Sequence, residues 1–250
     1  MHKRHWYHYV IALVIMAAVW EGLAIYLAIP AFPRLGEAVS AFAKGMAGGG
    51  PLLKHFGVSL YRVSIATLIS LVIGVPLGLY LGRTGGPIGS VLLYLAHPIP
   101  KVVFLPVIIV VLGIGDTAKI FLIALVILFQ IVVTVKDAAS AVSPGLVKSV
   151  QSLGGGEWAV FRHVILPASL PAIFTALRLS TGTAIAVLFF AETYATQLGL
   201  GALVWDAWAA RAFDLMFAGV MAMGLMGFGF YVLLDWVERL VCPWTAAQRN

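Results

Sequence analysis

The sequence predicts an all-α polytopic membrane protein with six transmembrane helices. Hydrophobic residues make up 62% of the 250-residue chain and charged residues only 10%, whereas soluble domains carry about 25% charge. A soluble protein of this size has too little interior to hide that much apolar surface. The apolar residues also fall into long segments that polar or glycine-rich stretches separate, which is typical of membrane spans.

The chain opens with a basic and aromatic segment, residues 1–9, which we expect to form a tail anchored at the membrane interface. Residues 10–29 follow as an apolar segment broken only by Glu21. A segment of this length spans about 30 Å as a helix. Because Ala28–Pro30 is a poor cleavage site, we expect an uncleaved span rather than a signal peptide.

A connection outside the membrane is expected at 30–56, with one short amphipathic helix at 34–46. The second span is expected at 57–82. It contains small residues and a proline of the kinds frequent in membrane helices, where small residues allow close helix contact. These are Gly74, Pro76, Gly78 and Gly82.

The third span, 88–112, is interrupted at His97–Lys101. Pro98 and Pro100 free backbone carbonyls and kink the helix, which membrane proteins tolerate where the backbone lines a cavity or is buried in protein. Lys101 would then lie near mid-depth, and an intramembrane cation is a candidate functional residue. The alternative is that residues 88–97 lie along the cytoplasmic interface, so that Lys101 reaches the lipid headgroups.

The remaining spans are expected at 117–136, 170–192 and 215–237, with a polar tail at 241–250. Arg178 and Glu192 lie about 21 Å apart along the fifth span, so they cannot pair with each other. We expect Arg178 to stabilise packing or to reach a headgroup, with a substrate contact as the alternative.

Residues 137–169 are the longest segment that resembles neither a span nor a simple turn. Gly154, Gly155 and Gly156 disfavour a continuous helix, because each glycine costs roughly 1 kcal/mol in a helix interior. We therefore expect two short helices with a hinge between them. Ser143 and Pro144 are suited to cap and start the first of these helices.

The second short helix carries Trp158, Phe161 and Ile165 on one face. Pro167 and Pro171 are expected to separate this helix from the fifth span, because proline removes a backbone donor and breaks a helix interior.

Six spans place both termini and the 137–169 loop on one side of the membrane. Eight Lys and Arg residues fall on that side: Lys3, Arg4, Arg83, Lys136, Lys148, Arg162, Arg239 and Arg249. Four fall on the other side: Arg34, Lys44, Lys54 and Arg211. Cytoplasmic loops carry an excess of positive charge, so the termini and the loop are expected in the cytoplasm.

Several kinds of chemistry are excluded. Lys148-Ser149 follows Val147, so no glycine-rich phosphate loop is present, and no Cys/His metal cluster or serine-nucleophile elbow occurs. We expect no catalytic residue, bound cofactor or metal in this chain, and the net charge of +6 indicates headgroup contact rather than nucleic-acid binding. His2, His5 and His8 could form a metal site, but a solvated tail is favoured because no acidic residue or cysteine lies nearby.

The stretch 148–167 resembles the cytoplasmic loop of permease subunits of ATP-binding-cassette importers. That loop carries Glu-Ala-Ala, three residues, Gly, nine residues, Ile, one residue and Leu-Pro. When the two are aligned on Leu166 and Pro167, the glycine falls on Gly154 and the isoleucine on the similar Val164. The Glu-Ala-Ala position instead reads Lys148-Ser149-Val150, which departs from the family pattern.

The resemblance extends from about residue 55 to residue 240 and is strongest to the branch of nitrate, taurine, alkanesulfonate and bicarbonate importers. The segments that carry it include Ser59–Val63, Gly74–Gly78, Pro98–Pro100, Leu112–Gly115 and Ala176–Leu179. It implies a type I importer membrane domain of the MetI-like fold, in the bacterial inner membrane. A permease core at 57–240 would follow an N-terminal region at 1–56.

The same resemblance implies a permease homodimer, two ATPase subunits that carry ATP and Mg on separate chains, and a binding protein that delivers a small, anionic solute. It makes 137–169 a coupling loop that docks on the ATPase. The coupling residues are expected to be Leu153, Gly154, Glu157, Trp158, Phe161, Arg162, Leu166 and Pro167. His97, Pro98, Pro100, Lys101 and Arg178 are the candidates for the substrate pathway.

Within the loop, Trp158 and Phe161 are the expected anchors, because large aromatic side chains dominate interface energetics. Glu157 and Arg162 would be rim charges, and Gly154 would let two backbones approach closely. The alternative is that the two aromatic residues pin the loop to the membrane interface.

Two other function classes stay open. A secondary transporter or channel would work without an ATPase. A secondary transporter would also show repeated halves, and no convincing internal repeat is present. A membrane-embedded enzyme would need converging histidines or acidic residues at one depth, and His97 with Glu192 does not make such a set.

Overall fold

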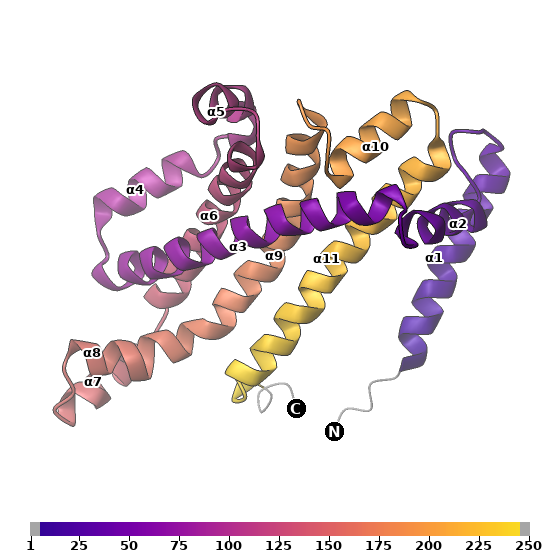
Figure 1. Cartoon of the computed structure of the whole chain (residues 1–250). Helices are drawn as coiled ribbons and strands as arrows, with labels where there is room; N and C mark the ends of the chain where they lie inside the picture. The colour runs from indigo at the N-terminus through magenta and orange to yellow at the C-terminus, as the bar shows by residue number, and fades with distance from the viewer. Residues whose placement is uncertain (1–5, 246–250) are drawn as a thin grey trace. The chain divides into compact units, whose positions relative to one another are not determined.

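The computed structural model describes residues 6–245, which are helical almost throughout and contain no strand (Figure 1). The α-helices are α1 (Trp6–Leu27), α2 (Leu35–Met46), α3 (Pro51–Thr84), α4 (Pro87–Ala96), α5 (Leu105–Leu112), α6 (Asp116–Ser140), α7 (Pro144–Ser152), α8 (Glu157–Val160), α9 (Leu166–Thr193), α10 (Leu200–Ala209) and α11 (Phe213–Val241). A 3₁₀ turn, η1 (Lys101–Phe104), precedes α5, and a π turn, η2 (Phe161–Ile165), joins α8 to α9. His2, Lys3, Arg4, His5 and Arg249 lie outside the described residues.

Five helices of the described part of the chain are long and apolar enough to cross a membrane. They are Val10–Leu27, Pro51–Thr84, Asp116–Ser140, Glu157–Thr193 and Phe213–Val241. The span expected at 88–112 is instead built from α4, η1 and α5, with an interruption at the two prolines as the sequence predicts. The fold is therefore the expected all-α membrane protein, with one broken span in place of a sixth continuous helix.

Several element boundaries differ from the expectation. Helix α3 begins at Pro51 rather than at 57, because proline suits the first position of a helix after the glycines of 48–50. Helix α10 lies in the connection expected between the last two spans. Helix α11 runs on to Val241, four residues beyond the expected end.

The chain divides into two compact units. The first contains residues 1–60 and 192–226, and the second contains residues 61–191 and 227–249. Helices α3, α9 and α11 each contribute residues to both units.

In the first unit, α1 packs against the turn that precedes α2 and against the start of α11 through aromatic rings. The ring of Trp20 lies 5.4 Å from that of Phe32 and 5.2 Å from that of Phe217, and its indole N–H donates to the carbonyl of Pro33 at 3.1 Å. Glu21, the acidic residue that interrupts the first apolar segment, accepts the backbone N–H of Leu35 at 3.1 Å. The charge within this span therefore caps the start of α2.

In the second unit, α3 packs closely against α6 through the predicted glycines. A Cβ added to Gly78 would lie 2.9 Å from the carbonyl oxygen of Val132, and one added to Gly82 would lie 2.5 Å from that of Lys136. Any larger side chain would force the two helices apart. The prediction that small residues allow close helix contact here is confirmed.

The expected separation of α8 from the fifth span is wrong. One helix runs from Glu157 to Thr193, with Pro167 and Pro171 inside it. The π turn supplies the reason, because the N–H of Leu166 reaches back five residues to the carbonyl of Phe161 at the place where Pro167 offers no donor. A π turn of this kind shifts the hydrogen-bond register and lets the helix continue.

Candidate functional site

Helix α7 begins as the sequence predicts. The hydroxyl of Ser143 accepts the N–H of Gly145 at 3.3 Å, and Pro144 occupies the first position. The helix ends at a turn in which Gly154 has φ +83°, a conformation that favours glycine. The backbone also folds back closely at the next glycine, Gly155, where an added Cβ would lie 2.8 Å from the carbonyl oxygen of Val150. The close approach of two backbones expected of Gly154 in ATPase docking stays a prediction.

The α7–α8 segment, residues 144–160, exposes large apolar side chains. The exposed fraction is 90% for Leu153 and 69% for Trp158, and no residue of α7 is buried. The ring of Trp158 stacks on that of Phe161, with 5.5 Å between centroids. The segment thus presents an apolar edge that its own chain leaves exposed, whereas Val160, at the end of α8, is fully buried.

An ion pair holds the start of α8 to the end of α3. A guanidinium nitrogen of Arg83 lies 2.8 Å from a carboxylate oxygen of Glu157. Glu157, expected to be a rim charge, therefore also fixes α8 in its own chain. Arg162 is exposed, whereas Leu166 and Pro167 are half-buried where the helix enters the core.

The base of this segment rests on the hydrophobic core of the second unit, to which α3, α6, α8, the π turn, α9 and the end of α11 contribute. Its buried members are Leu79, Ile131, Val135, Ala139, Val160, Ile165, Ile173, Phe174, Leu177 and Cys242. The exposed apolar edge therefore lies next to a well-packed hydrophobic core.

The break between α4 and α5 holds the second group of candidate residues. The ammonium of Lys101 donates to the carbonyls of Ala96, His97 and Ile99 at 2.9, 3.0 and 3.2 Å. It also lies 4.2 Å from the centroid of the Phe129 ring. The lysine is buried and satisfies carbonyls that the break has freed, so it holds the interruption of the span in shape.

A cavity of about 250 Å³ lies beside this break. It is lined by His97, Ile99, Pro100, Lys101, Val102, Val126, Gln130 and Val187. Gln130 donates to the hydroxyl of Thr183 at 3.2 Å, and its side-chain oxygen is buried with no hydrogen-bond partner. Val126 and Gln130 belong to the middle of α6, so this cavity lies halfway along a span.

Two side chains of the same chain, Glu238 and Thr175, bind the guanidinium of Arg178. Its guanidinium forms an ion pair with Glu238 of α11, and it donates to the hydroxyl of Thr175 at 3.2 Å. The Glu238 side chain is almost fully buried, with 3% exposure. These contacts tie α9 to α11, which agrees with the packing role expected for Arg178.

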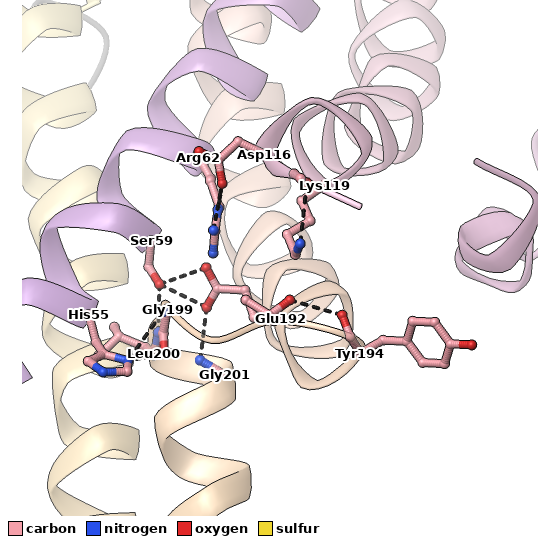
Figure 2. Close-up of polar contacts among 12 residues, drawn as sticks. His55, Ser59, Arg62, Asp116, Lys119, Glu192, Tyr194, Gly199, Leu200 and Gly201 are labelled. Carbon is pink, nitrogen blue, oxygen red and sulfur yellow. Dashed lines mark hydrogen bonds and ion pairs between the residues drawn. The ribbon is translucent and has the colours of Figure 1, made fainter. Parts of the chain in front are cut away.

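Sequence reasoning missed a buried cluster at the start of α10, which we call the Glu192 cluster (Figure 2). The hydroxyl of Ser59 lies 2.8 Å from both carboxylate oxygens of Glu192, and the N–H of Gly201 donates to one of them at 2.8 Å. The N–H of Leu200 donates to Ser59 at 2.8 Å, and His55 Nδ1 lies 2.7 Å from the carbonyl oxygen of Gly199. His55, Ser59, Glu192, Gly199, Leu200 and Gly201 make up this cluster.

Glu192 is fully buried and accepts a hydrogen bond from the N–H of Gly201 at the N-terminus of α10. It is linked to the N–H of Leu200 through the hydroxyl of Ser59. A carboxylate is favoured at that end of a helix. Gly199 has φ +140°, and an added Cβ would overlap the carboxylate. A signal was present in the sequence, namely an acidic residue at the end of an apolar segment with two glycines soon after it.

The second unit contains a further missed pair. Arg62, in the first half of α3, donates to the carboxylate of Asp116 at 2.8 and 2.6 Å (Figure 2). Asp116 is the first residue of α6, so the pair fixes the start of that helix to α3. Among residues 6–245, no group of three or more His, Cys, Asp or Glu side chains is placed to hold a metal ion.

A family model described as "Binding-protein-dependent transport system inner membrane component" matches residues 70–246. The chain belongs to this family.

Two curated permeases illustrate the relationship. The taurine transport system permease protein TauC of Escherichia coli strain K12 is 31% identical over 195 residues, which cover 77% of this chain and 71% of TauC. The putative aliphatic sulfonates transport permease protein SsuC of the same strain is 30% identical over 236 residues, which cover 93% of this chain and 89% of SsuC.

A solved structure of the MetNI methionine ABC transporter in an inward-facing conformation shares the fold. The TM-score is 0.62 at 20% identity, and the match covers 76% of this chain and 96% of the transporter chain. The chain is therefore an ABC importer permease of the MetI type, a non-catalytic, multi-pass component of the inner membrane, and the expected family and fold are confirmed.

Proposed function

We propose that two copies of this permease form the translocation path of an ATP-driven importer for a small anionic solute of the sulfonate or taurine class. The substrate class is supported by TauC and SsuC, whose names state taurine and aliphatic sulfonate transport. ATP and Mg are bound by an ATPase on a separate chain, and a binding protein delivers the solute.

The observation that carries the proposal is the exposed apolar edge of the α7–α8 segment. A large exposed apolar surface beside polar residues marks an interaction site. Leu153 and Trp158 would enter a groove of the ATPase, while the Arg83–Glu157 pair holds α8 in place. ATP-driven closure of the ATPase dimer would then displace α8, and α8 is continuous with the span that starts at α9.

The proposed orientation places both termini and the α7–α8 segment in the cytoplasm. It is supported by the excess of Lys and Arg on that side, eight residues against four. The binding protein would meet the opposite side, which contains α2 and the turn between α10 and α11.

The test is co-purification of the tagged chain with its ATPase from native membranes. Trp158→Ala is expected to abolish co-purification. An aromatic side chain that is exposed in the free chain and buried as an anchor in the complex contributes about 2 kcal/mol or more to binding. Trp236→Ala in α11, where the side chain is 59% exposed, is the matched control and should retain the ATPase. Equal amounts of ATPase with both variants would contradict docking at α8.

The break beside Lys101 is the proposed solute path. A buried cation next to a cavity at mid-span suits an anion electrostatically. Lys101→Met is expected to reduce uptake of the anion strongly, and the thermal stability of the variant, measured alongside, separates loss of transport from loss of fold. Uptake at the wild-type rate by this variant would remove Lys101 from the path.

A further inference from the structure

A cavity of about 280 Å³ lies between α7 and the ends of α3 and α6, within the second unit. The residues that line it are Gly82, Arg83, Ala139, Ser140, Val142, Pro144, Val147, Lys148, Gln151 and Ile165. Two of these residues are cations, and none is acidic. We call this hollow the Lys148 cavity, and the charge of its lining suits an anion.

The positive charge of the cavity is only partly neutralised by neighbouring carboxylates. Arg83 pairs with Glu157 through one nitrogen, and a guanidinium carries five N–H donors in all. Lys136, which precedes the α6 part of the lining, pairs with Asp137. Within the part of the chain that the structure describes, the ammonium of Lys148 has neither an ion pair nor a hydrogen bond. The cavity therefore includes one cation that no described carboxylate neutralises.

The remaining lining combines a polar amide with an apolar wall. Gln151 lies three positions after Lys148, so the two side chains share one face of α7. An amide nitrogen, an ammonium and a guanidinium all donate N–H groups, and the two charged ones form the stronger hydrogen bonds to oxyanions. The apolar part of the lining includes Ala139, Val142, Val147 and Ile165. An oxyanion with a short apolar body, such as an aliphatic sulfonate, matches this combination.

Position 148 is also where the chain departs from the pattern of its family, which carries glutamate there. A carboxylate at this position would oppose an anion in the cavity, whereas lysine attracts one. The proposed docking of Leu153 and Trp158 on the ATPase does not account for this change of sign. An anion bound in the Lys148 cavity does.

We propose that the Lys148 cavity binds a small oxyanion, and that this anion is the imported sulfonate after it has crossed the membrane. The lining comes from α3, α6, α7 and the π turn, so a bound anion would tie α7 to the ends of two spans. A ligand stabilises the arrangement that it binds best. Because ATP-driven transport requires the α7–α8 segment to move, the bound solute would slow its own uptake. This inference rests on the proposed function and adds a site of feedback to it.

Binding is measured on the complex of permease and ATPase, purified in a maltoside detergent that carries no phosphate. Ethanesulfonate is titrated by calorimetry at an ionic strength held constant with chloride. We expect saturable binding that Lys148→Gln weakens about tenfold or more, because a hydrogen bond to a charged group contributes more than a neutral one. Gln151→Leu should weaken it about threefold. Lys44→Gln in α2, the same change at an exposed lysine outside the cavity, is the matched control and should bind like the wild type.

Two further measurements keep this result interpretable. Lys101→Met should retain the binding that depends on Lys148, which separates the cavity from the proposed solute path. The amount of co-purified ATPase and the unfolding temperature show whether each variant is folded and assembled, and Gln151→Leu serves as the test if Lys148→Gln is not. Equal affinities of the wild type and both cavity variants, or no saturable binding, would overturn the site.

A lipid headgroup offers the same oxyanion chemistry, because its phosphate lies near the ends of membrane spans. Phosphatidylglycerol is therefore added to the detergent complex before the titration. Ethanesulfonate binding that persists identifies a free anion as the ligand. Loss of that binding, together with more phosphatidylglycerol retained by the wild type than by Lys148→Gln in native mass spectrometry, would assign the cavity to a headgroup and overturn feedback by the solute.

Uptake into proteoliposomes tests the feedback, with the binding protein outside and ATP inside. Vesicles preloaded with ethanesulfonate should take up taurine at half the rate of chloride-loaded vesicles or less, and Lys148→Gln should remove this difference. ATP-dependent uptake that internal sulfonate does not slow would overturn the feedback and leave the importer in place. Binding that depends on Lys148, in a complex without ATP-dependent uptake, would support the site and overturn the proposed function.

Discussion

The Glu192 cluster and the α7–α8 segment differ in which groups they expose to their surroundings. The cluster buries a polar side chain, whereas the segment exposes apolar side chains. Glu192 has a polar carboxyl group with no exposed surface, and its oxygens accept bonds from Ser59 and Gly201 of the same chain. Leu153 is an apolar side chain with 90% of its surface exposed, and Trp158 of the same segment is 69% exposed. The polar groups of the first region are hydrogen-bonded within one chain, whereas the apolar side chains of the second are exposed and available to a partner.

This difference predicts that substitutions in the two regions affect different properties, namely the stability of the fold and the binding of the ATPase. Changes in the Glu192 cluster should unfold or loosen the permease, because a buried polar group that loses its partner costs about 1–3 kcal/mol. Changes at the exposed edge should leave the fold intact and act on the ATPase instead. Each prediction below would break that separation if it failed.

The largest effect is expected from Gly199→Ala. The residue has φ +140°, and a new Cβ would overlap the Glu192 carboxylate, so strain and overpacking together should cost about 3 kcal/mol or more. Thermal unfolding in detergent measures it. Gly224→Ala in α11, where an added Cβ meets nothing within 4 Å, should be neutral or slightly stabilising.

A smaller effect is expected from Glu192→Gln. The amide keeps the shape but replaces one acceptor oxygen by a donor, which then faces Ser59 or Gly201, at a cost of about 2 kcal/mol. Glu157→Gln is the counterpart, because its ion pair with Arg83 is exposed and such pairs contribute about 0–1 kcal/mol. Similar shifts in the unfolding midpoint of the two variants would contradict the comparison.

The smallest effect on stability is expected from Leu153→Ser, which should change the free energy of unfolding by about 0.5 kcal/mol or less. Its effect should appear in ATPase co-purification, which we expect to fall. Val160→Ser is the matched change at a fully buried position seven residues away, and it should lower the unfolding temperature clearly. A stable Val160→Ser variant would show that the core beneath α8 is looser than its packing indicates.

The sequence predicted the features that depend on local chemistry. Ser143 and Pro144 start α7 as expected, the prolines interrupt the third span, and Gly78 and Gly82 lie against α6. Each of these follows from backbone geometry or side-chain size at the residue itself. The expected roles of the loop residues in ATPase docking, and of Lys101 in the path, stay predictions.

The sequence did not reveal features that depend on residues far apart in the chain, or on one local structure that offsets the effect of another. Ser59 and Glu192 are 133 positions apart, so their hydrogen bond cannot be found from spacing. Gly154 takes the left-handed conformation and Gly155 makes the close contact with Val150, and spacing alone does not distinguish the two within one glycine run. Pro167 was taken as a helix end, since its usual effect is cancelled by the turn before it.

That π turn, Phe161–Ile165, also changes how the helix should be aligned with those of other permeases. Successive residues of an α-helix differ in direction by about 100°, so a helical wheel drawn straight through 157–193 misplaces Trp158 relative to α9 by about that angle. The wide turn absorbs one residue while the faces on either side keep their directions. A permease that lacks one residue here could therefore present the same aromatic edge, and an alignment should allow a single-residue gap at this position rather than shift the whole loop.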